Sequence, residues 1–406
     1  MGKRDGLLLR LKNFRRKIQE EGFIPAFAHA LFRRFRSAAG RVKKKRFEHK
    51  FSGMLAPLLD VPSDLTENQA LEQINRYDRM EKMPFSQKTV FEIQYDLMIV
   101  VPVYNTEKYL EECITSILHQ KTKYRFLAVF VNDGSTDGSD AILQRYETCP
   151  NVKVIRQENR GLSGARNRAM ETMYGKYIMF VDSDDLLEEG AVEKLMDTAV
   201  REDADIVEGG YIKFGEGMQD WVQCRDFDEP VKADQSMLTG FASMKVIKSS
   251  LFQDLCFPRG IWFEDTIMQE LLYSASRNVW IIPDIVYRYR QNPEGISATA
   301  QTHAKVLDTW WITKFCLEEK VQRGYLIDAY ARELFFVQLQ RNNRRLKNMP
   351  EEVQESVFVL SCGLYAQYFA ELPKPDSFLD SCLDRALKNR SWRAYQCVME
   401  NWNAMR

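Results

Sequence analysis

The chain carries the sequence Tyr-Ile-Met-Phe-Val-Asp-Ser-Asp-Asp at residues 177–185. Five apolar or aromatic residues in succession predict a strand that is buried on both faces, and three carboxylates follow where this strand should end. Carboxylates so close together repel one another unless a cation lies among them, and Asp182 and Asp184 could both offer oxygens to Mg²⁺ or Mn²⁺. The alternative is an acidic turn that caps the next helix, expected over residues 188–200.

The length and composition of the chain indicate a soluble globular protein with room for more than one module. It has 406 residues, of which 45% are apolar and 28% are charged, and these values argue against a disordered or fibrous protein. Its eight cysteines are scattered without a Cys-x-x-Cys pair, so we expect reduced thiols in the cytoplasm. The start of the chain lacks the apolar core of a signal peptide, and no apolar run is long enough to predict a membrane span.

Basic residues are concentrated at the start of the chain. Residues 1–50 hold sixteen Lys or Arg against four acidic residues, although the whole chain has 57 of each kind. Apolar residues recur at helical spacing on either side of Gly22-Phe23, which predicts two amphipathic helices with basic opposite faces. We expect this extension to bind an anionic membrane surface, at the inner face of the cell membrane. The alternative is packing on the main domain; no base-reading motif supports a nucleic-acid partner.

The pattern of apolar runs divides the chain into four ranges. Residues 1–50 form the basic extension, and residues 51–91 predict a helical connector between proline breakers. Residues 92–300 alternate between apolar runs and helical patterns, which predicts an α/β domain with a mostly parallel sheet flanked by helices. Residues 301–406 predict helices that could support the acceptor side, dock on a membrane or form a homo-oligomer.

Polar clusters follow three of the strands predicted in the α/β domain. Pro102 to Asn105 follow the first strand, Asp133 follows the second, and the acidic loop at 182–185 follows the fourth. The carboxyl ends of parallel strands meet at one edge of a sheet, and ligands of such sheets bind there. The sequence therefore predicts a site at this edge for a nucleoside diphosphate and a metal ion.

These three polar clusters and a fourth stretch, at 159–167, belong to motifs that are followed by Phe263-Glu264-Asp265 and by Tyr289-Arg290 with Ser297. The four are VVPVYN at 100–105, VNDGSTD at 131–137, NRGLSGARN at 159–167 and FVDSDD at 180–185. Over roughly residues 95–300 the sequence resembles the inverting glycosyltransferases of family 2, which have the GT-A fold.

The resemblance implies a binding site for a nucleotide-sugar donor, with UDP as the expected nucleotide. Pro102, Tyr104 and Asn105 would line the nucleoside pocket, and Asp133 would accept a hydrogen bond from the base edge. Arg166 would approach the diphosphate from the opening turn of a helix, where the helix dipole also favours phosphate. The alternatives are an Asp-Gly turn at Asp133 and a solvated helix arginine at Arg166.

The same resemblance implies a metal ion and a catalytic base. Asp182 would contact the ribose or the metal ion, and Asp184 would coordinate Mn²⁺ or Mg²⁺ directly. Asp265 is expected to take the proton of the acceptor hydroxyl; the alternative is an acidic helix start, which the helix dipole favours and which would be preferred without the upstream motifs. Arg290 and Ser297 would belong to a mobile segment that closes over the donor diphosphate.

The function expected from these residues is transfer of a sugar from a UDP-sugar to a hydroxyl group. The acceptor would be a growing glycan of the cell envelope, linked to a lipid and reached at the membrane surface. Two other hypotheses stay open at this point. One is a phosphatase with an aspartyl nucleophile, and the other is a membrane-binding module whose acidic loop only caps a helix.

Overall fold

The computed structural model describes residues 41–77, 85–292 and 303–405. Within it the chain forms two compact units, Glu81–Tyr325 and a second unit in which Leu326–Arg406 joins the start of the chain. The two amphipathic helices expected in residues 1–40 lie outside the described residues, as does Ser297. The domain boundaries expected from the sequence stay predictions, and each unit is described by itself.

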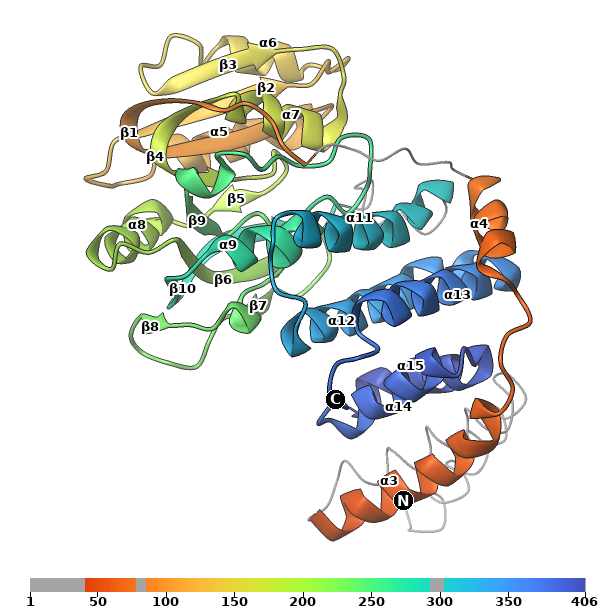
Figure 1. Ribbon diagram of the computed structural model, residues 1–406. Coiled ribbons are helices and arrows are strands. Elements are labelled where there is room, and N and C mark those ends of the chain that lie inside the picture. Colours follow the sequence, from red (N-terminus) through yellow and green to blue (C-terminus); the bar gives the residue numbers. More distant parts are fainter. Residues whose placement is uncertain (1–40, 78–84, 293–302, 406) are drawn as a thin grey trace, which may run out of the picture. The chain divides into compact units, whose positions relative to one another are not determined.

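The unit Glu81–Tyr325 is built on a ten-stranded sheet with the strand order β3-β2-β1-β4-β9-β6-β10-β5 (Figure 1). Its first four strands are parallel, as the apolar runs predict. Taken together these runs are rich in Val, Ile, Phe and Met, which suit strands buried on both faces, as β2 and the second halves of β1 and β4 are. Their bounds are Val152–Arg156 for β3, Phe126–Asn132 for β2, Val90–Val103 for β1 and Thr172–Phe180 for β4.

The second half of the sheet is mixed. The short strand β9 (Lys245–Lys248) runs antiparallel between β4 and β6 (Ile206–Phe214). Strand β10 (Val279–Arg290) then pairs parallel with β6, so β6 and β10 run in the same direction as β1 to β4. The carboxyl ends of these six strands therefore lie at one edge. The remaining antiparallel strands are β5 (Leu186–Leu187), β7 (Trp221–Gln223) and β8 (Val231–Lys232).

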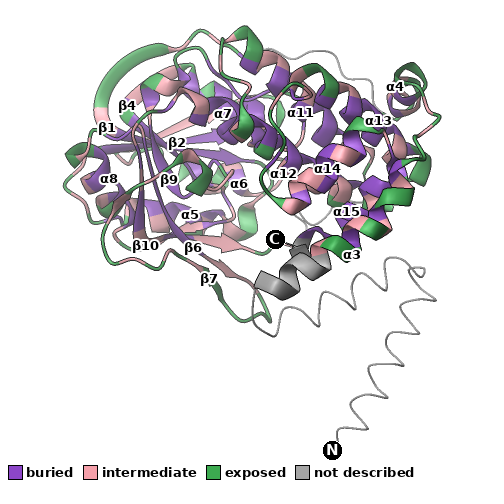
Figure 2. Ribbon diagram, turned by 60° about the horizontal axis from the view of Figure 1, so that its bottom comes forward, coloured by how far each residue is buried: buried purple, intermediate pink, exposed green. Residues whose placement is uncertain are grey.

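Helices cover both faces of this sheet, whose central strands are buried (Figure 2). On one face α5 (Glu107–Leu118), α6 (Ser139–Gln144) and α8 (Ala191–Arg201) contribute to a continuous apolar core with alternate residues of β1, β2 and β4. Helix α7 (Gly161–Met170) packs on β1 and β2 from the other face. The loops at the carboxyl edge are thus anchored between two packed layers.

The segment after β9 leads to an irregular helix. Its 3₁₀ turn η2 (Ser249–Phe252) packs against β4, and Phe257 further along the chain lies 5.3 Å from Phe180, edge to face. A π-helical turn, η3 (Met268–Leu272), continues into α9 (Tyr273–Ala275), where the sequence predicted one regular helix. Helix α11 (Asp308–Gln322) contacts η3 within the same unit.

The second unit is helical. Helix α4 begins at Thr66, whose side chain and that of Gln69 form a reciprocal capping box. It packs on α13, while α3 contacts α14 and α15, with Phe51 and Phe378 in edge-to-face contact at 6.0 Å. Its helices are α3 (Arg41–Leu59), α4 (Glu67–Asn75), α12 (Ala329–Arg345), α13 (Glu351–Tyr368), α14 (Phe378–Lys388) and α15 (Trp392–Met405).

Two expectations about the whole chain can be compared with the structure. The eight cysteines, all in the described part of the chain, form no disulfide there, and the expected reduced state stays a prediction. Among residues 41–77, 85–292 and 303–405, no helix combines the length and the apolar character that crossing a membrane requires.

Gly175 provides a test of the contact between β4 and β1. A Cβ atom at this position would lie 2.3 Å from the Met98 nitrogen and 2.6 Å from the Tyr177 oxygen, so Gly175→Ala should lower the stability by about 1–3 kcal/mol. Gly53→Ala in α3, where the Cβ would meet nothing within 4 Å, should cause no loss. Urea unfolding of both variants measures the change in stability. Equal unfolding midpoints for the two variants would contradict the tight contact at Gly175.

Candidate active site

The loops that follow β1 and β2 are joined by reciprocal hydrogen bonds. The Asn105 backbone nitrogen donates to Ser135 Oγ at 3.1 Å, and the Thr136 backbone nitrogen donates to Asn105 Oδ1 at 2.8 Å. Asn105 has a φ of 51°, a left-handed conformation that asparagine tolerates better than most residues. Pro102 is buried below this loop and Tyr104 is 49% exposed above it. The geometry is that of a fixed loop with one aromatic ring presented to solvent.

Asp133 is buried at the same edge, with 3% of its surface exposed. Its backbone nitrogen donates to the Val103 carbonyl at 2.8 Å. Its Oδ1 accepts hydrogen bonds from Gln157 Nε2 at 2.6 Å and from the Arg160 backbone nitrogen at 2.8 Å. Asp133 therefore does more than form an Asp-Gly turn, because it also fixes the loop that leads into α7.

Arg166 connects two acidic segments that are far apart in the sequence. Its Nη2 donates to Asp182 Oδ1 at 2.9 Å and its Nη1 donates to Glu264 Oε1 at 2.7 Å. The side chain is only 4% exposed, and its guanidinium lies over the rings of Phe257 and Phe180 at 5.1 and 5.7 Å. The sequence placed Arg166 in the opening turn of a helix, but α7 begins at Gly161. Arg166 therefore lies in the second turn of α7, where its side chain contacts the carboxyl groups of Asp182 and Glu264.

The three aspartates of the acidic loop have different environments. Asp182 is partly exposed, with 34% of its side chain accessible. Asp185 is 1% exposed; its Oδ2 accepts from the Tyr287 hydroxyl at 2.8 Å and its Oδ1 accepts from the Arg290 nitrogen at 2.7 Å. The Tyr287 hydroxyl also accepts from the Asp182 nitrogen at 3.1 Å. Asp185 thus fastens the loop to β10, and it leaves Asp182 and Asp184 as the aspartates available to a ligand.

Asp184 is held by Asn292, whose Nδ2 donates to Asp184 Oδ2 at 3.0 Å. Burial raises the pKa of Asp184; the hydrogen bond from Asn292 opposes this shift, and the negative charge of Asp182 adds to it. A cation beside both carboxylates would relieve this repulsion. Asn292 follows β10, a strand that the sequence did not predict, and its role was therefore missed.

The donor set of the acidic loop suits a cation that shares its ligands with a substrate. Among the described residues, no group of three or more His, Cys, Asp or Glu side chains is arranged to hold a metal ion. The protein would therefore supply the two carboxylates of Asp182 and Asp184. Mg²⁺ is commonly held by one or two carboxylates together with substrate phosphates, so these residues fit Mg²⁺ or Mn²⁺ bound with a nucleotide.

Arg290 is the last residue of β10 and is fixed on several sides. Its Nε donates to the Asp184 carbonyl at 2.7 Å, and its Nη2 donates to Glu112 Oε2 at 2.7 Å. The guanidinium lies over the rings of Phe214 and Tyr109 at 4.6 and 4.8 Å. The sequence expected Arg290 in a mobile segment, whereas the structure places it in a strand beside the acidic loop.

Glu264 and Asp265 follow a residue with a strained backbone. Phe263 has a φ of 64°, which is unfavourable for a bulky residue and is often found near functional sites. Burial raises the pKa of Glu264 to about 7; Arg166 opposes this shift and the charge of Asp265 adds to it. Asp265 is half-buried at the start of the turn that leads into η3. Its carboxylate therefore lies beside the bridge formed by Arg166.

Comparison with known proteins connects this site with sugar transfer. The family described as glycosyl transferase family 2 matches residues 98–265. Glycosyltransferase GlyG of Streptococcus pneumoniae serotype 4 is 33% identical over 221 residues, which cover 50% of this chain and 73% of GlyG. The poly(ribitol-phosphate) beta-glucosyltransferase of Bacillus spizizenii is 30% identical over 207 residues, which cover 49% of this chain but 33% of that relative.

A solved structure shares the fold. The crystal structure of residues 1–349 of S. aureus TarS in complex with UDP-GlcNAc matches with a TM-score of 0.59 and 20% identity. The match covers 76% of this chain and 91% of that one. At this identity the likeness concerns the fold alone, and it confirms the α/β class with the GT-A arrangement.

The environment of Glu264 predicts how stability depends on pH. Because its pKa is raised from 4.5 to about 7, the folded state keeps a proton that the unfolded state releases, so wild-type stability falls between these pH values. Glu264→Gln cannot ionise. Its melting temperature relative to wild type should therefore rise as the pH rises from 4.5 to 7, as measured by differential scanning calorimetry. If the difference in melting temperature between the variant and wild type does not change with pH, this result would contradict the burial of an ionisable Glu264.

Proposed function

The chain belongs to glycosyltransferase family 2, and from this membership we propose that it is a metal-dependent, inverting enzyme that uses a UDP-sugar. The acceptor that we propose is a hydroxyl group on a growing, lipid-linked glycan of the cell envelope. Family membership leaves an aspartyl phosphatase or a non-catalytic membrane module without support. Two similar proteins support the choice of substrates: TarS was crystallised with UDP-GlcNAc, and the B. spizizenii relative is named for a poly(ribitol phosphate) acceptor.

One observation carries the proposal: a single buried arginine holds the donor-side and acceptor-side acids together. Arg166 contacts Asp182 in the loop after β4 and Glu264 next to Asp265. A transferase needs a cation site for the leaving diphosphate and a base for the attacking hydroxyl within reach of one sugar. The bridge brings candidates for both roles to one edge of the sheet.

The nucleoside would bind over the joined loops after β1 and β2. Pro102 and Asn105 would form the floor of this pocket, the exposed ring of Tyr104 would pack on the base, and Asp133 would accept a hydrogen bond from the base edge. The contacts of Asn105 with Ser135 and Thr136 support this assignment, because a loop that is already ordered loses little entropy on binding.

The diphosphate would lie beside Asp182 and Asp184, which would hold Mn²⁺ or Mg²⁺. When bound, this metal ion would neutralise negative charge on the departing nucleotide. Asn292 keeps Asp184 in place, and Arg290 holds the backbone of the same loop. We assign Arg166 a positioning role for Asp182 and Glu264, and we assign Ser297 and Arg290 to the donor side of the site.

Asp265 is the proposed base. Its carboxylate takes the proton of the acceptor hydroxyl while the hydroxyl oxygen forms a bond to the anomeric carbon of the sugar. The bond between this carbon and the diphosphate oxygen breaks, and the nucleoside diphosphate leaves with the electron pair. Attack from the face opposite to the leaving group inverts the anomeric configuration. Glu264 beside it stays in contact with Arg166 and so fixes the turn that carries Asp265.

The extension of residues 1–50 is proposed to hold the enzyme at the cytoplasmic face of the membrane. Its sixteen basic residues against four acidic ones favour an anionic lipid surface, where each basic residue can add about 1 kcal/mol. A lipid-linked acceptor is confined to the same surface, so membrane binding would raise its local concentration at the enzyme.

Substitutions of the two central aspartates test the proposed chemistry. Asp184→Asn and Asp265→Asn should each lower transfer from a UDP-sugar by at least about a hundredfold, the usual scale for losing one central catalytic interaction. Release of UDP in the presence of Mn²⁺, screened over several UDP-sugars, is the measurement. Asp226→Asn, an exposed aspartate in the same unit, serves as the control. Full activity of either variant, or of wild type in excess chelator, would refute the assigned roles.

Removal of residues 1–40 tests the proposed membrane binding and leaves helix α3 complete. The shortened protein should lose its association with anionic liposomes in a sedimentation assay, because ten of the sixteen basic residues are removed. Its metal-dependent hydrolysis of a UDP-sugar should be retained. Liposome binding equal to that of the full chain would show that this segment is not the membrane anchor.

A further inference from the structure

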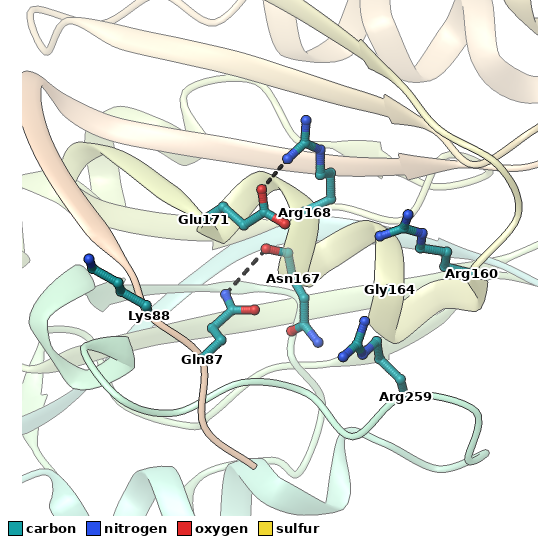
Figure 3. A pocket seen from close by; sticks show the side chains of 8 residues that line it. All are labelled: Gln87, Lys88, Arg160, Gly164, Asn167, Arg168, Glu171 and Arg259. Atoms are coloured by element: carbon teal, nitrogen blue, oxygen red, sulfur yellow. Dashed lines mark hydrogen bonds and ion pairs between the residues drawn. The ribbon is translucent and has the colours of Figure 1, made fainter. Parts of the chain in front are cut away.

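A basic cleft of about 300 Å³ lies along one side of α7 (Figure 3). Positions 160, 164, 167, 168 and 171 line it, and their spacing of three and four residues places them on one face of the helix. Arg166 projects from a different face, toward Asp182 and Glu264. Helix α7 therefore separates this cleft from the proposed diphosphate site.

The cleft contains cationic side chains that no residue in the described part of the chain neutralises. Arg168 pairs with Glu171, the one acidic residue among those described in its lining. Lys88, Arg160 and Arg259 are exposed, and their side chains form no hydrogen bond or ion pair with any residue that the structure describes. Three like charges at one concave surface repel one another, and an anion between them would relieve that repulsion.

Asn167 holds the three segments that supply these charges. Its Oδ1 accepts from the Phe257 backbone nitrogen at 2.9 Å, and its Nδ2 donates to the Phe257 carbonyl at 2.7 Å. Its own carbonyl accepts from Gln87 Nε2 at 3.2 Å. Asn167 is 6% exposed. Its contacts with Gln87 and Phe257 fix the segments that carry Lys88 and Arg259. The cleft is thus a built feature of the fold.

We propose that Lys88, Arg160 and Arg259 bind a phosphate group in the backbone of the acceptor glycan. This inference rests on the proposed function, because it treats the second anionic ligand of the enzyme as the acceptor. Guanidinium and ammonium groups are the side chains that bind phosphate most strongly. Arg259 also lies six positions before Asp265, in the segment that carries the proposed base. An acceptor phosphate in the cleft would therefore hold the chain beside the acceptor side of the active site.

The chemistry of the cleft favours a phosphate-bearing chain over a membrane surface. Among the described residues that line it, none has an apolar side chain. A segment that lies on a membrane usually inserts apolar or aromatic residues between the lipids. A concave surface without apolar side chains suits a flexible hydrophilic chain whose phosphates are spaced along it.

Binding of a synthetic poly(ribitol phosphate) oligomer to the full-length chain tests this assignment, with fluorescence anisotropy as the measurement. The double variant Lys88→Gln/Arg259→Gln should weaken binding at least about tenfold, the usual scale for losing charge-assisted hydrogen bonds. Both side chains are exposed, so folding should not change. Arg125→Gln, an exposed arginine just before β2 that does not line the cleft, should bind as wild type does.

Hydrolysis of a UDP-sugar, measured in parallel, distinguishes a role of the cleft in acceptor binding from a role in donor binding. The double variant should retain it, and its loss would overturn the assignment to the acceptor. Unchanged binding of the oligomer by the double variant would also overturn it. If the double variant binds the oligomer as wild type does but binds phosphatidylglycerol vesicles more weakly, the cleft would be assigned to the membrane. If wild type binds the oligomer but hydrolyses no UDP-sugar, the proposed glycosyl transfer fails while phosphate binding in the cleft stands.

Discussion

The contacts of the Arg166 guanidinium with the carboxyl groups of Asp182 and Glu264 are the interactions on which the site depends. Burial lowers the pKa of this arginine, but the charges of Asp182, Glu264 and Asp265 more than offset that effect and raise it. Removing one partner of a buried ion pair commonly costs about 3–5 kcal/mol, because the remaining charge is left uncompensated. The loop after β4 and the turn at Phe263 therefore keep their positions together. Asp182 and Glu264, which we propose on the donor and acceptor sides, contact one guanidinium, and a change in one of them alters the electrostatic environment of the other.

Helix α7 has two faces with different tasks. One face directs Arg166 toward the acids, and Phe180 and Phe257 surround its guanidinium. The other face carries Asn167, which fastens neighbouring segments, and Arg160 at the helix start, whose side chain pairs with no residue that the structure describes. A single helix thus lies between the two anionic ligands that we propose, the donor diphosphate and an acceptor phosphate. In the proposed mechanism, this arrangement would keep the two negatively charged substrates apart.

The first half of the sheet follows from the sequence, as does the helical character of residues 301–406, and the second half of the sheet does not. The uninterrupted apolar runs of β1, β2 and β4 predict buried parallel strands and place the acidic loop at their carboxyl ends. Strands β6 and β10 were not predicted because they contain Gly209-Gly210 and Pro283, residues that normally interrupt strands. Tyr287 and Asn292 were missed with them. The contact between Arg166 and Glu264 joins residues 98 positions apart, and no local pattern predicts such a pairing.

The proposed mechanism depends on the assignment of the nucleotide and the metal ion to the edge formed by β1, β2 and β4. The most direct measurement is a crystal structure of the chain with UDP and Mn²⁺, with the metal located by its anomalous scattering. We predict a manganese peak beside Asp182 and Asp184, with the base over Asn105 and next to Asp133. UDP bound in the cleft of Lys88 and Arg259, or a manganese ion away from both aspartates, would contradict the proposed mechanism.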